Sequence, residues 1–151
     1  MRLLIQRVKQ AKVKVENKVV AKISKGILIF QGVENDDDES DISWLVNKVL
    51  NLRIFNDSNK VMNLSVKNIE GQILVVSQFT LMASTKKGNR PSYINAAPQK
   101  IAFPLYENFV QILKNKSKLN VLTGEFGADM KVSLINDGPV TIIIDSKNRD
   151  F

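Results

Sequence analysis

The chain has 151 residues, 44% of them apolar and 25% charged, a formal net charge of +7, and neither cysteine nor histidine. Without those two residue types it has no disulfide, no thiolate nucleophile and no imidazole base. Any metal would be held by oxygens alone. We expect neither a metal nor a cofactor. No apolar run approaches the ~20 residues that span a bilayer, and the N-terminal segment becomes charged too early for a signal peptide. We therefore expect one domain over residues 1–151, in the cytoplasm and without membrane contact.

The first fifth of the chain predicts three β-strands separated by short polar turns. Apolar and β-branched residues mark them at Leu3–Val15, Val19–Ile23 and Gly26–Val33. Within the first of these strands the polar residues change from odd to even positions. One extra residue would explain this change, and we predict a β-bulge near Gln10-Ala11.

A cluster of carboxylates comes next, since six of the 15 acidic residues lie within residues 34–41. It leads into a predicted helix over residues 38–52, with Asp38 or Ser40 as N-cap. Carboxylates are favourable at a helix N-terminus, which explains the cluster structurally. The alternative, a divalent-ion site, does not fit the spacing of an EF-hand loop. The apolar stripe of this helix consists of Ile42, Leu45, Val49 and Leu52.

The second half of the chain predicts a buried strand, a helix and a strand-rich end. The buried strand is Ile73–Val76, and the helix covers residues 99–116, with Pro104 bending it or marking its effective start. Val121-Leu122, Met130–Ile135 and Val140–Asp145 are further strands. The core side of the second helix consists of Ile101, Leu105, Phe109, Ile112 and Leu113. This order predicts an α+β fold, with a mainly antiparallel sheet or partial β-barrel and two principal helices packed on it.

Ser77-Gln78-Phe79-Thr80 follows the buried strand directly, a common place for functional groups. Because the chain lacks histidine, a nucleophilic Ser or Thr would need Lys, a carboxylate or the substrate itself as base. The ordinary interpretation is a strand end with Phe79 in the core. Residue spacing alone does not decide between these two interpretations.

Asn136-Asp137-Gly138-Pro139 separates two β-like runs near the end of the chain. Asp-Gly is a strong signal for a hairpin turn, and Pro139 suits the first position of a following strand. A cis peptide bond between Gly138 and Pro139 is the alternative, and it would turn the carbonyl groups in an unusual direction.

Other segments restrict the function without defining it. Residues 124–130 lack the lysine and the strand–loop–helix context of a phosphate-binding loop, so their two glycines more plausibly allow a close backbone approach. Outside residues 34–41 the chain has 22 basic and nine acidic residues, a net charge of +13. This surface, including Lys86-Lys87-Gly88-Asn89-Arg90, either attracts a polyanion such as RNA or is simply a solvated lysine-rich surface.

Taken together, these segments resemble the D-aminoacyl-tRNA deacylase family along essentially the whole chain. The order and spacing of two of the motifs, SQFTL and NDGPVT, make the resemblance specific, whereas neither motif would suffice alone. A minor departure is Tyr93, where Phe is usual. The matching segments are MRLLIQRV at the start, RIFND at 53–57, VSQFTL at 76–81, GNRPSY at 88–93 and GEFGADMKVSLINDGPVT at 124–141.

The resemblance implies a homodimer that hydrolyses the ester between a D-amino acid, or glycine, and the terminal ribose of tRNA. It implies a cis Gly138-Pro139 motif that enters the active site of the other subunit, where its carbonyl oxygens exclude an L side chain. The expected partners are thus the acceptor end of aminoacyl-tRNA and a second copy of the chain, and no DNA.

By the same resemblance, Ser77, Gln78, Phe79 and Thr80 form the catalytic wall, with backbone N–H groups facing the scissile carbonyl. The resemblance further implies that Phe126 and Met130 bind the adenosine or the amino group, and that Arg7 supports the Gly-Pro loop. Either the ribose 2′-hydroxyl assists an attacking water, or Thr80 attacks. The alternatives from other classes are a non-catalytic RNA-binding module and a small-metabolite esterase.

Overall fold

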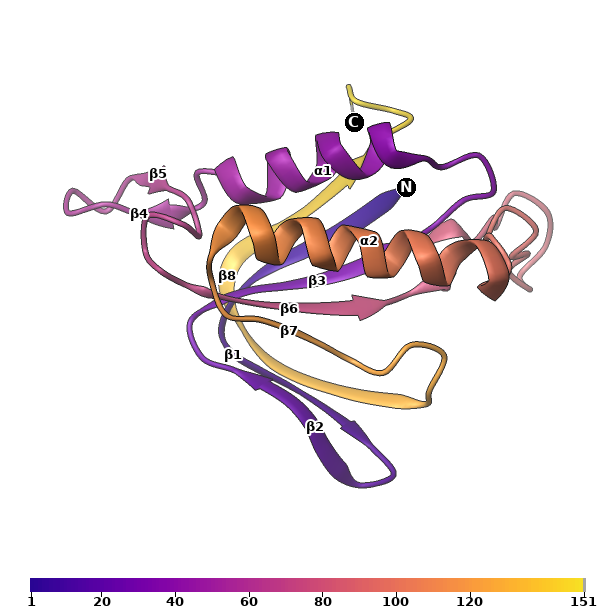
Figure 1. Cartoon of the computed structure of the whole chain (residues 1–151), viewed down its shortest axis with the longest axis horizontal. Coiled ribbons are helices and arrows are strands. Elements are labelled where there is room, and N and C mark those ends of the chain that lie inside the picture. The colour runs from indigo at the N-terminus through magenta and orange to yellow at the C-terminus, as the bar shows by residue number, and fades with distance from the viewer. Residues whose placement is uncertain (151) are drawn as a thin grey trace.

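The two long helices lie on the same side of a six-stranded sheet in the computed structural model, which describes residues 1–150 (Figure 1). They pack against each other as well as against the sheet. The helices are α1 (Glu39–Asn51), α2 (Gln99–Ser117) and the short 3₁₀ helix η1 (Phe79–Met82). The strands are β1 (Arg2–Val15), β2 (Lys18–Ile23), β3 (Gly26–Gly32), β4 (Phe55–Asn56), β5 (Met62–Leu64), β6 (Gln72–Ser77), β7 (Val121–Thr123) and β8 (Met130–Asp145).

The long strand β1 organises the sheet. Its first half pairs with β3, its second half pairs with β2, and β8 pairs with both halves, all antiparallel. The pairs β3–β6 and β6–β7 are parallel, so that the sheet is mixed. The prediction of an α+β fold with two helices on a partly closed sheet is confirmed, and the parallel pairs are a feature that it did not include.

The predicted bulge is present in β1, at Lys9, just before the expected position. Between the pairs Val8↔Asn136 and Gln10↔Ile135, β1 has one residue more than β8. The odd-numbered apolar residues of β1 consequently change from one face of the sheet to the other. The phase change in the sequence was therefore a correct signal, accurate to about one residue.

Two apolar cores result from this change of face. The larger one lies between the sheet and both helices, and the smaller one lies on the opposite face, where β2 and the first half of β8 curve over β3 and β6. The smaller core consists of Val8, Ala11, Val13, Ala21, Ile23, Leu28, Leu74 and Val76. It gives the molecule a partly closed, barrel-like half beneath the helical layer (Figure 1).

Helix α1 begins as predicted, with Asp38 as its N-cap. The Asp38 carboxylate accepts hydrogen bonds from the Ser40 and Asp41 N–H groups, and the Asp41 carboxylate accepts one from the Asp38 N–H in return. This reciprocal pair is a capping box. The structural explanation of these two members of the acidic cluster is thereby confirmed.

Helix α2 begins at Gln99, so the interpretation of Pro104 as its effective start is wrong. The carbonyl of Pro98 accepts the first helical hydrogen bonds, which fixes the start there. Ile101 is also wrongly predicted as core, because it is 36% exposed while the neighbouring Ala102 is buried. The buried face is rotated by about one residue, and Tyr106 belongs to it.

Within residues 1–150, no helix combines the length and the apolar character of a membrane span.

The predicted hairpin turn at Asn136–Pro139 is wrong, because β8 continues through it and both halves pair with β1. The strand instead bulges between its pairs with Gln6 and Val8. The Asn136 side chain donates hydrogen bonds to the carbonyls of Arg7 and Val140, closing the bulge from within. The Gly138–Pro139 peptide bond in this bulge is cis.

Candidate active site

A cleft of about 380 Å³ lies where β3 and β6 end. Five of the residues singled out from the sequence line it: Ser77, Gln78, Phe79, Phe126 and Met130. The first three come from one segment, and the other two come from the segment that leads into β8. The fold thus brings together two parts of the chain that are about 50 residues apart in the sequence.

The wall after β6 presents two unused backbone donors. Strand β6 ends at Ser77, and the Gln78 N–H donates to the carbonyl of Gln31 at 2.7 Å. The next two N–H groups, those of Phe79 and Thr80, begin the 3₁₀ helix and have no hydrogen-bond partner in residues 1–150. Gln78 is therefore fixed in the sheet, whereas Phe79 and Thr80 keep donors for a ligand.

The Thr80 side chain has no base beside it in the described part of the chain. Its hydroxyl oxygen accepts a hydrogen bond from the Gln78 side-chain amide. An amide NH₂ group donates protons and does not take them. Thr80 is half-buried and does not itself line the cleft. The geometry therefore suits a positioning group better than an activated nucleophile.

Phe79 points outward, so the interpretation that placed it in the core is wrong. Its side chain is 56% exposed. The chain turns into η1 immediately after Gln78, which takes Phe79 off the alternation of β6. Its ring meets the edge of Tyr93, with 5.1 Å between ring centroids.

The opposite wall is aromatic. Phe126 contacts the rings of Phe103 and Tyr106, at 5.1 and 5.3 Å between centroids. The Tyr106 hydroxyl donates to the carbonyl of Val75 at 3.1 Å, and burial raises the pKa of this phenol, so it stays protonated. The close approach expected at both glycines is found at Gly124, where an added Cβ would lie 2.5 Å from the Met130 sulfur, but not at Gly127, where an added Cβ would have no neighbour within 4 Å in the described part of the chain.

Gln31 and Tyr106 are among the cleft residues that were missed from the sequence. Tyr106 was missed because the buried face of α2 was predicted about one residue away from its actual position. Gln31 had a usable signal, because it is a polar residue in an otherwise apolar strand. It is 2% exposed, and its side-chain oxygen has no hydrogen-bond partner within residues 1–150.

Arg7 supports the bulge of β8. Its side chain is buried, and it donates to the carbonyl of Asp137 at 3.0 Å and to the carbonyl of Ile54. It also forms an ion pair with the Asp137 carboxylate at 3.1 Å. The bulge is thus held from below by a charged group, while Gly138 and Pro139 are exposed.

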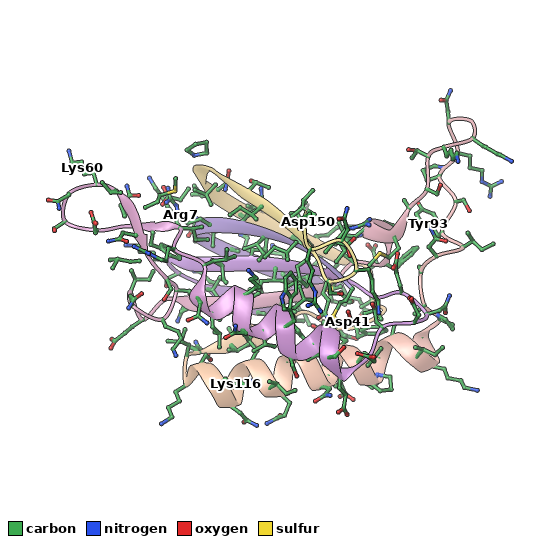
Figure 2. The ribbon with its side chains drawn as sticks, turned by 90° about the horizontal axis from the view of Figure 1, so that it is seen from above. Arg7, Asp41, Lys60, Tyr93, Lys116 and Asp150 are labelled. Carbon is green, nitrogen blue, oxygen red and sulfur yellow. The ribbon has the colours of Figure 1, made fainter. Side chains whose placement is uncertain are left out.

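Gly138 and Pro139 do not line the cleft of their own protomer. Arg7, beneath the bulge, pairs with Ile27, whereas Ser77 pairs with Gln31 farther along β3. At about 3.3 Å per residue, these positions are roughly 13 Å apart along the strand. Figure 2 shows Arg7 toward the end of the molecule marked by Lys60, and Tyr93, which contacts the cleft wall, at the opposite end.

Three carboxylates of the acidic cluster, those of Glu34, Asp36 and Asp37, lie within 4.8 Å of one another. Asp37 accepts a hydrogen bond from the buried N-terminal ammonium of Met1. This ammonium supplies the positive charge next to the Asp37 carboxylate that a bound metal ion would supply in a cation site. Burial raises the pKa of Glu34 and of Asp37. None of the three lines the cleft, and the cleft residues offer no comparable set of oxygens.

Sequence comparison adds the family to this geometry. The family model described as D-Tyr-tRNA(Tyr) deacylase matches residues 4–145. The chain belongs to this family. The match spans both walls of the cleft and the bulge of β8, so the deacylase family and the two motifs cover the same residues.

Relatives agree with this assignment, and a solved structure shares the fold. A D-aminoacyl-tRNA deacylase from Flavobacterium psychrophilum is 63% identical over 150 residues, covering 99% of this chain and 100% of the relative. One from Flavobacterium johnsoniae is 58% identical with the same coverage. A solved structure named c-Myc DNA Unwinding Element Binding Protein superimposes with a TM-score of 0.92 at 37% identity, covering 96% of this chain and 98% of that one.

Proposed function

We propose that this chain hydrolyses the ester between a D-amino acid, or glycine, and the 3′-terminal adenosine of tRNA. The observation that carries the proposal is the cleft at Ser77–Phe79, whose wall continues into η1 with the Phe79 and Thr80 N–H groups unpaired within residues 1–150. Donors of this kind stabilise the oxyanion that develops when water attacks an ester carbonyl. The family and its relatives are named for D-aminoacyl-tRNA. We extend this substrate to glycine and to the ester on the terminal adenosine, and charged tRNA would be met in the cytoplasm.

The proposed mechanism needs little chemistry from side chains. An aminoacyl ester is already labile, and oxyanion donors contribute about 10²–10³-fold while positioning adds several powers of ten. The cleft offers no imidazole or thiolate, and no base contacts the Thr80 hydroxyl in residues 1–150. We assign activation of the attacking water to the ribose 2′-hydroxyl and a positioning role to Thr80. Phe126 and Met130 would contact the adenosine or the amino group from the opposite wall.

Rejection of L-aminoacyl-tRNA is assigned to Gly138 and Pro139 of a second subunit. In support, both residues are exposed and lie away from the cleft of their own protomer. Within residues 1–150, strand β8 pairs only with β1, which leaves a 16-residue strand with an open edge. Ile135 and Ile143 on this strand are 48% and 38% exposed. A long open strand edge with apolar side chains is suited to binding a second copy of the chain. In a symmetric dimer, the Gly138-Pro139 motif of each subunit would then complete the cleft of its partner.

Release of the amino acid from tRNA tests the activity directly. We expect purified protein to release D-tyrosine and glycine from their tRNAs and to leave L-tyrosyl-tRNA intact. Binding of D-tyrosyl-tRNA without release would instead support the alternative of a non-catalytic RNA-binding module. Equal activity on a free D-tyrosine ester would favour a small-metabolite esterase.

A second comparison separates the two mechanisms. Substrate ending in 2′-deoxyadenosine, with its ester on the 3′-hydroxyl, should react at least 100-fold more slowly, the scale on which a positioned proton-transfer group contributes. Thr80→Ala keeps the backbone N–H and removes only the positioning hydroxyl, so this variant should lose less rate than the deoxy substrate does. If the deoxy substrate were cleaved normally and the Thr80→Ala protein were inactive, Thr80 would be the nucleophile and the RNA-assisted mechanism would be wrong.

A further inference from the structure

A basic loop stands out from the body of the protein next to the cleft. We define it as residues 84–93, which the Ser84 and Ser92 backbones close with two hydrogen bonds of 2.8 and 2.9 Å. Its cations are Lys86, Lys87 and Arg90, and all three are exposed. Figure 2 shows this loop, marked by Tyr93, projecting at the end of the molecule opposite Lys60.

No acidic residue offsets these charges nearby in the sequence, since residues 71–106 contain neither Asp nor Glu. None of the three cations forms a salt bridge or a side-chain hydrogen bond within residues 1–150. By contrast, Lys147 and Arg2 are paired with Asp41 and Asp145. The basic loop therefore keeps its positive potential, which attracts a polyanion.

Apolar surface lies at the base of the same loop. Tyr93 is 41% exposed, the next residue, Ile94, is 80% exposed, and the Tyr93 ring contacts Phe79 of the cleft wall. Surfaces that bind single-stranded nucleic acid combine cations for the phosphates with aromatic rings on which bases stack. A duplex would need only the cations, because its bases are already stacked.

We propose that the basic loop binds the single-stranded 3′ end of tRNA, the nucleotides just before the terminal adenosine. Lys86, Lys87 and Arg90 contact their phosphates, and a base packs on Tyr93. The loop tip lies four residues from either end of its closing bridge, roughly 13 Å in extended chain, so the RNA strand leads along the loop into the cleft. This inference rests on the proposed function for the identity of the RNA, and on the charge pattern for the contact itself.

Binding of an uncharged acceptor-stem hairpin with a single-stranded 3′ end tests the contact independently of hydrolysis. The test variant combines Lys86→Glu, Lys87→Glu and Arg90→Glu. The matched control combines Lys18→Glu, Lys22→Glu and Lys25→Glu, three exposed cations of the β2 region with the same total charge change. We expect the loop variant to bind at least 10-fold more weakly in 50 mM salt, and the control to change no more than about twofold.

The salt dependence of binding gives a second readout. The slope of log K against log salt should fall by about two in the loop variant, since each single-strand phosphate contact contributes ~0.7. Equal weakening by both variants would overturn the proposal.

Cleavage assays localise the effect further. On D-tyrosyl-adenosine, which lacks the preceding phosphates, the loop variant should react at the wild-type rate, whereas on D-tyrosyl-tRNA its kcat/KM should fall at least 10-fold. Loss of activity on both substrates, or a change of oligomeric state in ultracentrifugation, would show that the loop builds the cleft or contacts a second copy, and would contradict the proposal. Wild-type protein inactive on both substrates would refute the proposed function, while the hairpin-binding comparison would still decide the loop.

Stacking on Tyr93 has its own pair of variants. Tyr93→Ala should weaken binding of the hairpin about fivefold or more, as expected when a base loses its ring partner. Tyr93→Phe keeps the ring and should bind as the wild type does. A blunt hairpin without the single-stranded end should not distinguish the two variants. If it did so as strongly as the original hairpin, the contact would be with the duplex.

Discussion

The wall at Ser77–Thr80 and the bulge at Gly138–Pro139 are held in place by different forces. The wall continues a buried parallel strand and is fixed by the apolar cores on both sides of the sheet. The bulge is fixed by polar contacts from Arg7 and Asn136 and faces outward. Only the first borders the cleft of its own protomer. This difference supports our proposal that one protomer holds the hydrolytic half of a site and presents the selective half to another molecule.

The largest expected effect concerns the backbone donors of the wall. Phe79→Pro removes the Phe79 N–H, at the first position of a helix, where proline is tolerated. Phe79→Ala removes the same ring but keeps the donor. We expect kcat on D-tyrosyl-tRNA to be about 10²–10³-fold lower in the Pro variant than in the Ala variant. Single-turnover rates measure this ratio, and equal rates in the two variants would remove the Phe79 N–H from the mechanism.

A smaller effect is expected from Gly138→Ala in the bulge. Within the protomer an added Cβ would contact only the Asn136 side-chain oxygen, at 3.6 Å, so the melting temperature should not change. In a partner's cleft the same methyl group would crowd the substrate. We expect kcat/KM to fall about tenfold or more, corresponding to the ~1–3 kcal/mol that overpacking costs. Wild-type activity in this variant would show that Gly138 does not border a cleft.

Arg7→Met should weaken the support of the bulge. It removes the hydrogen bonds to the carbonyls of Asp137 and Ile54, and the free energy of unfolding should fall by about 1–3 kcal/mol in urea denaturation. The ratio of D- to L-tyrosyl-tRNA cleavage should fall several-fold because the bulge loses its fixed position. Arg53→Met is the matched control, since the exposed Arg53 also donates to a carbonyl, that of Asn63. An unchanged D/L ratio with normal stability would separate Arg7 from selectivity.

The smallest effect concerns Arg2, which donates to the carbonyl of Leu81 in η1 and pairs with Asp145. Burial alone would raise the pKa of Asp145, but the hydrogen bonds from Arg2 and from the Lys147 N–H, together with the positive charges of Arg2 and the N-terminus, outweigh it and lower that pKa below the usual 3.8. A carboxyl group whose pKa is lower in the folded than in the unfolded protein stabilises the fold at any pH above its unfolded-state pKa. This stabilisation is lost as the pH falls through the folded-state pKa. Arg2→Met should therefore reduce the unfolding free energy by about 1 kcal/mol at pH 7. At pH 3 the difference should shrink, and a difference that grew on acidification would contradict this assignment.

Local signals in the sequence predicted most of the fold. The strands of the first 33 residues, the Asp38 cap and the buried strand before Ser77 were found because each depends on a short pattern of residues. The phase of α2 was missed because Ala102 and Tyr106, rather than the more apolar Ile101, face the core. The turn at Asp137-Gly138 was mispredicted because pairing of both halves of β8 with β1 outweighs local turn preference.

The candidate site was predicted only in part. Ser77, Gln78 and Phe79 could be singled out at a strand end, and Phe126 and Met130 by family resemblance, and all five line the cleft. That the Gln78 N–H is already used by Gln31 depends on parallel pairing between β3 and β6, which no local pattern shows. The separation of Gly138 from the cleft is likewise a property of the three-dimensional sheet.

Subunit mixing tests the central claim, that the two halves of a site come from different subunits. Phe79→Pro and Gly138→Ala proteins, each with reduced activity, are unfolded together, refolded at equal concentration and assayed on D-tyrosyl-tRNA. Random pairing gives hybrids in about half of the dimers, and each hybrid of a symmetric dimer has one site with both halves intact. We predict recovery to about a quarter of wild-type activity. If each bulge served its own protomer, every site in the mixture would carry one substitution, and activity no higher than the mean of the two variants alone would contradict the account.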